Sequence, residues 1–114
     1  MPHFIIHCSE SILTSTSPDE LMQQVYNEAD STGLFTKGDI KVRIQSFEHY
    51  NIGNTKEDFI HIFGNIMEGR TDEQKMDLSK RIISKLKTEF SNVPIISINI
   101  RDFEKGSYCN KAMV

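Results

Sequence analysis

The chain begins MPHFII, and its second residue is the first that could take part in chemistry. Pro2 stands directly before an apolar run, with a single methionine in front of it. Small second residues such as proline permit removal of an initiator methionine, which would leave Pro2 as a free secondary amine. An apolar pocket with nearby cations lowers the pKa of such an amine towards neutrality, where it can accept and return a proton. The simpler interpretation is that Pro2 starts an edge strand, a position where proline is tolerated.

Arg70 is a second candidate, because it precedes the predicted start of a helix in the stretch EGRTDEQK. Gly69 permits a tight turn there, and Thr71 is a suitable cap for the helix that follows. A helix N-terminus presents unpaired amides and a partial positive charge, so a guanidinium beside it suits a carboxylate. The alternative is an arginine that simply faces solvent.

Other chemistries find little support in the sequence. His3 and His7 share one face of a predicted strand but lie too far apart to bind one ion, and His49 and His61 lack a carboxylate or cysteine companion. The chain has neither a glycine-rich phosphate loop nor a serine in a G-x-S-x-G setting. We therefore expect no metal site and no cofactor.

Composition narrows the class of protein further. With 114 residues the chain is long enough for about one domain, 1–114, and its net charge of -3 argues against a general nucleic-acid binder. Neither a signal-peptide pattern nor a membrane-length apolar run is present, which predicts a cytoplasmic protein without a membrane partner. Cys8 and Cys109 lie at opposite ends of the chain and are interpreted as structural or incidental.

The sequence repeats itself, with units at about 2–48 and 57–103. IKVRIQSF, at 40–47, aligns with ISINIRDF, at 96–103, at an offset of 56 residues. Upstream, HFII pairs with DFIH at an offset of 55. Each segment alternates apolar and polar residues, which indicates strands with one buried face.

A helix is predicted between the two strands of each repeat. The first begins after Ser17, which forms a capping box with Glu20, and stops at Gly33. The second begins after Thr71, with Gln74 as its capping partner. The expected apolar stripes are Leu21, Met22, Val25, Tyr26 and Ala29 in the first helix, and Met76, Ile82, Ile83, Leu86 and Phe90 in the second.

Two strand–helix–strand units predict an α/β (α+β) fold, with a four-stranded sheet and both helices on one face. A crossover helix implies parallel strands within each unit, and the stretch 45–56 is expected to connect the units. Arg70 can approach Pro2 if the units run antiparallel, related by a pseudo-twofold axis. The other face of the sheet would be uncovered, and so large an uncovered face is unusual for a small domain. We therefore expect other subunits to cover it in a symmetric oligomer.

Taken together, the start PHFII, the repeated units and GRTDEQK resemble the tautomerase superfamily. Within it the chain is most similar to the 5-carboxymethyl-2-hydroxymuconate isomerases, through the PHF start and the segment STGLFTKGDIKVR. Its second half is also similar to the 4-oxalocrotonate tautomerases, through EGRTDEQK and NVPIISINI. The resemblance covers nearly the whole chain.

This resemblance implies a homotrimer of double units with the sheets inside. It also implies cofactor-independent movement of a proton between carbons of an unsaturated keto or enol carboxylic acid, as in aromatic degradation. Pro2 would be the catalytic base, and Arg70 would hold a carboxylate or polarise the carbonyl. Another family arginine falls on Lys41, with Arg43 two residues on, and lysine is the weaker bidentate partner for a carboxylate. The exact substrate therefore stays open.

Two alternatives remain from the sequence. A trimeric family member that has lost its activity could act as a binding or assembly protein, consistent with Lys41 and with a Pro2 nitrogen blocked by a retained Met1. A phenylpyruvate-type keto–enol tautomerase is the other. Tyr108 could close the pocket of a neighbouring subunit or simply lie in the tail.

Overall fold

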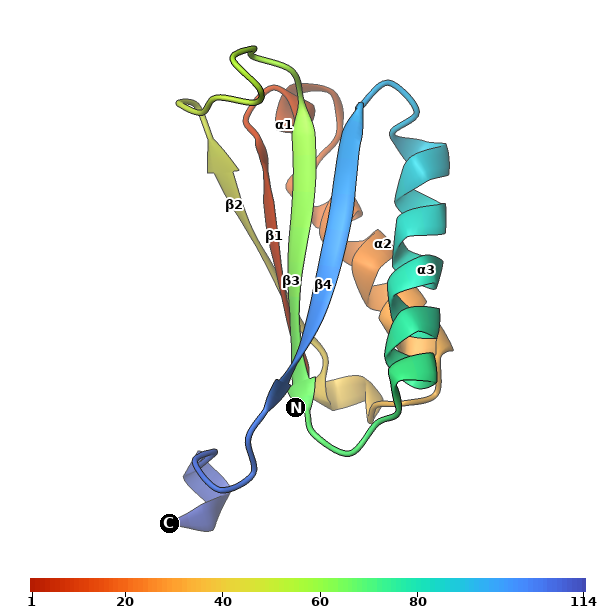
Figure 1. Ribbon diagram of the computed structural model, residues 1–114, viewed down its shortest axis with the longest axis vertical. Coiled ribbons are helices and arrows are strands. Elements are labelled where there is room, and N and C mark those ends of the chain that lie inside the picture. The colour runs from red at the N-terminus through yellow and green to blue at the C-terminus, as the bar shows by residue number, and fades with distance from the viewer.

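The computed structural model describes residues 1–114 and has two layers, a sheet and the helices that cover one side of it (Figure 1). The strands are β1 (His3–Ser9), β2 (Lys41–Phe47), β3 (Phe59–Met67) and β4 (Ile95–Phe103). The helices are α1 (Ile12–Ser15), α2 (Pro18–Ser31) and α3 (Asp72–Glu89), with short 3-10 turns at Lys37–Asp39 and Lys111–Met113. None of the helices is long and apolar enough to cross a membrane.

The sheet has the order β2-β1-β3-β4. β1 pairs with β2 and β3 pairs with β4 in parallel, whereas β1 and β3 pair antiparallel. The structure thus confirms the predicted α+β fold, with α2 and α3 on the same face. It also places the two strand–helix–strand units antiparallel to each other, which is the arrangement needed to bring Arg70 towards the start of β1.

Pro2 starts an internal strand, so the edge-strand interpretation is wrong. β1 lies between β2 and β3, and Pro2 immediately precedes its first residue. Its carbonyl oxygen accepts a hydrogen bond from the Lys41 amide (3.1 Å). The pairing of β1 with β2 begins at His3, so no backbone N–H of Pro2 is needed for it. Proline is therefore tolerated at the head of an internal strand because the pairing begins one residue later.

The first strands of the two repeat units, like their second strands, align at an offset of an even number of residues. Phe4 is fully buried against the helices, whereas Phe59 lies on the opposite side of the sheet and its neighbour Ile60 takes the buried position. Side chains alternate between faces along a strand, so a spacing of 55 pairs residues on opposite faces. The 55-residue offset is therefore wrong, and the spacing of 56 that relates Ile40 to Ile96 suits the first strands as well.

The helix boundaries follow the predicted caps. Ser17 Oγ accepts from the Glu20 amide (3.1 Å), one half of the expected capping box. Thr71 and Gln74 form the complete capping box, in which the Gln74 amide donates to Thr71 Oγ1 (3.1 Å) and the Thr71 amide donates to Gln74 Oε1 (2.9 Å). α2 ends at Ser31, before Gly33 with its positive φ of 72°. The segment that joins the units spans 48–58 instead of the predicted 45–56, because β2 continues to Phe47 and β3 begins only at Phe59.

The core lies between the sheet and the helices, and the predicted stripe residues Ile82, Leu86 and Phe90 belong to it. The buried residues of α3 are Leu78, Ile82 and Leu86, spaced four apart. Met76 is 55% exposed, so its assignment to the apolar stripe is wrong. Two residues advance a helix by about 200°, which points Met76 away when Leu78 faces the sheet. The core side chains of the other elements include Phe4, Ile6, Leu21, Val25, Ala29, Ile60, Ile62 and Ile66.

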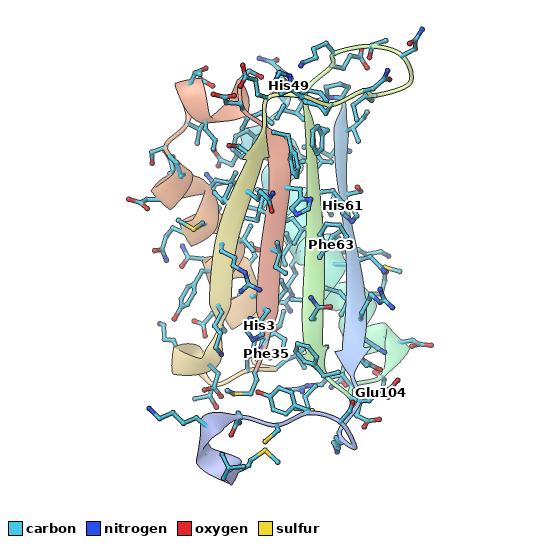
Figure 2. The ribbon with its side chains drawn as sticks, turned by 90° about the vertical axis from the view of Figure 1, so that its left-hand side faces the viewer. His3, Phe35, His49, His61, Phe63 and Glu104 are labelled. Carbon is cyan, nitrogen blue, oxygen red and sulfur yellow. The ribbon has the colours of Figure 1, made fainter.

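The side of the sheet without helices is called the open face here. It faces the viewer in Figure 2. Three rows of side chains in register cross it, counted from the rim at the head of β1: His3, Lys41, Asn65 and Arg101; Ile5, Arg43, Phe63 and Asn99; His7, Gln45, His61 and Ser97.

Candidate active site

Pro2 is fully buried at the head of β1. In the structure the terminal amine belongs to Met1, which is half-buried. Burial lowers the pKa of this amine, Asp39 raises it, and Lys41 and Arg70 lower it. Two cations and one carboxylate from three different segments therefore act on the N-terminus, and the net effect favours a neutral amine.

Arg70 reaches this end of the molecule from the turn between β3 and α3. Its guanidinium donates to the carbonyl oxygens of Leu34 (2.6 Å) and Met67 (3.3 Å) and lies over the Phe35 ring, 5.2 Å from its centre. The side chain is half-buried and bridges two loops, so the solvent-facing alternative is wrong. A guanidinium has five N–H donors. Those not engaged by the carbonyls remain available to an anion.

Lys41 and Arg43 both come from β2 and project onto the open face. Lys41 is half-buried, and its Nζ donates to the backbone oxygen of Asp39 (2.7 Å). Arg43 is exposed, and its Nη1 lies 3.0 Å from Nδ1 of His3. The four residues singled out in the sequence therefore lie at the same end of the sheet, Arg43 through its contact with His3.

Sequence reasoning named Tyr108 as a possible pocket residue but missed Phe103 and the contact between the two rings at this end. Phe103, the last residue of β4, packs edge-on against His3 with ring centres 5.9 Å apart, and Tyr108 of the tail lies 5.5 Å from Phe103. Phe35, also labelled in Figure 2, packs edge-on against the buried Phe4 with ring centres 6.2 Å apart, on the helix-covered side of the sheet, whereas His3 lies on the open face. The repeat implied that β4 ends beside β3, but no local signal indicated that the tail turns back to Phe103.

The sequence suggested only one possible role for His3, that of a metal ligand. In the structure its pKa is lowered by burial first, and then by Arg43, Lys41 and the terminal amine. No group of three or more His, Cys, Asp or Glu side chains is placed to hold a metal ion. The residues at this end supply an amine, cations and aromatic walls, which suit an anionic organic ligand.

The site lies apart from a broad groove on the other side of the sheet's outer strand β4. That groove runs between α3 and the outer edge of β4, and its lining includes Lys75, Met76 and Ser97. Lys75 forms an ion pair with Asp102 there (3.1 Å). The chemistry-bearing residues around Pro2 instead lie at the rim of the open face.

Comparison with known proteins gives one consistent family. Residues 2–110 match the family model described as 5-carboxymethyl-2-hydroxymuconate isomerase. A curated relative from Escherichia coli, 5-carboxymethyl-2-hydroxymuconate Delta-isomerase, is 26% identical over 93 residues, which make up 80% of this chain and 74% of the relative.

Solved structures share the fold over almost the whole chain. A 5-carboxymethyl-2-hydroxymuconate isomerase from Deinococcus radiodurans R1 has a TM-score of 0.80 at 20% identity, covering 96% of this chain and 88% of its own. A fused 4-OT, solved as a wild-type symmetric trimer, has a TM-score of 0.78 at 14% identity, covering 98% of this chain and 95% of its own.

Proposed function

The chain belongs to the 5-carboxymethyl-2-hydroxymuconate isomerase family, within the tautomerase superfamily, and on that premise we propose that it moves a proton between carbons of an unsaturated keto or enol carboxylic acid. Pro2 is the base and acid of this reaction once Met1 has been removed. One observation supports it most: Lys41, Arg70 and Asp39 all act on the terminal amine of Met1, one residue before Pro2 at the head of β1.

The proton balance of the reaction requires nothing beyond the amine. The unprotonated Pro2 nitrogen takes a proton from one position of the conjugated substrate, so that one C–H or O–H bond breaks and an N–H bond forms. It then returns the proton to another carbon of the same molecule. Negative charge on the intervening oxygen needs an electrophile, and preorganised cations in a poorly hydrated site stabilise such charge. Isomerisation follows without a cofactor.

Arg70 and the two β2 cations take different parts in this proposal. Arg70 is held by two backbone carbonyls and keeps free N–H groups, so it binds a substrate carboxylate or the developing oxyanion. Lys41 presents a point charge next to the base, and Arg43 offers a planar fork for a further carboxylate. An acid with several carboxylates fits this set of charges.

We further propose that residues 1–114 work as one domain made of the two repeat units. Residues of both units meet at the site, since Pro2, Lys41 and Arg43 belong to the first and Arg70 to the second. The cytoplasmic location and the role in aromatic degradation remain predictions.

The pH dependence of the reaction tests the electrostatics around Pro2. A base works unprotonated, so kcat/KM falls as the pH drops through the pKa of the amine. Lys41 lowers and Asp39 raises the pKa of the terminal amine of Met1, and we expect the same two charges to act in the same directions on the Pro2 amine one residue later. Lys41→Gln is therefore expected to move the acid limb of kcat/KM to higher pH, and Asp39→Asn to move it to lower pH. Rate profiles from pH 5 to 9 would check this; shifts in the same direction for both variants would contradict it.

The open face supports assembly into a trimer. Phe63 lies near its centre, packs against His7 and His61 with ring centres 4.9 and 4.6 Å away, and is still 38% exposed (Figure 2). Its neighbours across the sheet, Ile5 and Asn99, belong to the same uncovered surface. Aromatic and apolar side chains in a broad surface of this kind favour contact with other subunits. We propose that this face lines the inside of a homotrimer.

A charge placed at Phe63 tests the assembly. Phe63→Glu is expected to convert the trimer to monomer at micromolar concentration, because burying an unpaired carboxylate in an interface is strongly unfavourable. Asn27→Glu adds the same charge to the exposed side of α2 and should leave the trimer intact. Light scattering coupled to size-exclusion chromatography gives the mass of each. A Phe63→Glu chain that remains trimeric would contradict the proposed interface.

Turnover of two substrates tests the function itself. The assay uses chain shown by intact mass to begin at Pro2. We expect it to isomerise 5-carboxymethyl-2-hydroxymuconate with a higher kcat/KM than it tautomerises phenylenolpyruvate, because only the former has carboxylates for several cations. Higher efficiency with phenylenolpyruvate would favour a phenylpyruvate-type tautomerase. No turnover of either above background would indicate a binding or assembly protein.

A further inference from the structure

His3 joins the first strand to Arg43, which is exposed and has no other polar contact to a side chain. The Arg43 Nη1 atom lies 3.0 Å from His3 Nδ1, and the imidazole also packs edge-on against Phe103. Arginine has only donors, so Nδ1 must be the acceptor of this hydrogen bond. His3 is therefore neutral in this contact and carries its proton on Nε2.

The position of this contact along the sheet is informative. In the parallel register Arg43 is level with Ile5, whereas His3 is level with Lys41. The hydrogen bond thus runs diagonally between residues that are two positions apart along the strands, a rise of about 6.6 Å, and it draws the Arg43 guanidinium and the His3 ring together on the side of the head of β1. Without His3, no other side chain would keep the guanidinium near the head of β1, where Pro2 lies. The long arginine side chain would then sample many rotamers in solvent.

We propose that His3 is a positioning residue, whose neutral imidazole holds the Arg43 guanidinium towards Pro2 so that Arg43 binds a second substrate carboxylate, away from the group held by Arg70. This role rests on the proposed function of the same site. Ordering the guanidinium before the substrate arrives removes part of the entropy cost of binding, and its effect is specific to substrates with more than one carboxylate.

The surroundings of His3 favour its neutral form. Facing it are the Met1 amine, Lys41 and Arg43 from the first unit, uncharged Asn65 from β3, and Phe103 from β4. Burial lowers the pKa of His3 below the usual value for histidine, and Arg43, Lys41 and the terminal amine lower it further. No carboxylate faces the ring to offset them, so Nδ1 remains an acceptor at neutral pH.

Two substitutions at His3 separate positioning from a structural role. In His3→Leu the acceptor is lost, and we expect KM for 5-carboxymethyl-2-hydroxymuconate to rise about tenfold with kcat within about twofold of wild type. KM for phenylenolpyruvate, which has one carboxylate, should stay within about twofold. His3→Asn places an amide oxygen near the position of Nδ1 and should restore most of the lost affinity. A merely structural role would change both substrates alike and show no rescue.

Three results would overturn the role of His3 while leaving the function intact. They are an unchanged KM for the tricarboxylate in His3→Leu, equal KM changes for both substrates, and failure of His3→Asn to restore affinity. If His3→Leu does not fold, 15N NMR of the wild-type imidazole decides: a proton on Nδ1 at pH 7 contradicts the proposed hydrogen bond. Inactivity of the wild-type chain towards both substrates would instead overturn the proposed function.

Discussion

Pro2→Ala is expected to lower kcat/KM at neutral pH about 100-fold, at the lower end of what a positioned acid–base group contributes. Alanine in second position also permits removal of Met1, so the variant keeps an amine. That amine is primary, rotates freely about its bond to the Cα, and lacks the ring that fixes the nitrogen at the head of β1. Steady-state kinetics on chain of verified N-terminus measure the loss.

A matched variant separates catalysis from stability. Pro2 is buried, so its truncation removes packing as well as the secondary amine. Pro94 is exposed immediately before β4, far along the chain from Pro2, and Pro94→Ala should retain wild-type kcat/KM. Thermal unfolding of both variants monitors the fold. A Pro2→Ala chain with an unchanged rate would remove Pro2 from the mechanism.

Arg70→Ala is expected to lower kcat/KM by about 100- to 1000-fold, the usual effect of losing one group that stabilises an oxyanion. Arg70→Lys should recover only part of the rate, because an ammonium lacks the planar fork of donors. The alanine variant also leaves the carbonyls of Leu34 and Met67 without their donor, which is expected to cost about 1–3 kcal/mol of folding free energy. Kinetics and urea unfolding measure the two effects separately.

Arg81 offers the control for this variant. It also ties α3 to the end of α2, donating to the Ser31 carbonyl (2.9 Å) and to Asp77 (2.9 Å), but it has no contact with the site around Pro2. Arg81→Ala should therefore reduce stability and leave kcat/KM within about twofold. Equal losses of activity in the two alanine variants would show that Arg70 acts through the fold and not on the substrate.

The features that could be predicted are those with local causes. Helix caps depend on a few adjacent residues. The start of α3 was therefore predicted correctly from Thr71 and Gln74, and the end of α2 from Gly33. Parallel pairing follows from the crossover helix in each unit. The approach of Arg70 to Pro2 followed from this topology together with the antiparallel relation of the units, and needed no knowledge of side chains.

The features that could not be predicted depend on contacts between distant segments. Whether Met76 or Leu78 faces the core depends on how α3 is rotated against the sheet, and both residues fit a helical stripe on their own. The position of Phe59 depends on strand register, where an error of one residue moves a side chain to the other face. The His3–Arg43 bond depends on the register of β1 with β2, 40 residues apart in sequence.

The most direct test of the account compares two forms of the same chain that differ only at the N-terminus. One form begins at Pro2, and the other retains Met1, which converts the Pro2 nitrogen to an amide without a basic lone pair. With 5-carboxymethyl-2-hydroxymuconate as substrate, the account predicts turnover by the form that begins at Pro2 and background rates for the form that retains Met1. Equal turnover by the two forms would contradict catalysis by the Pro2 amine.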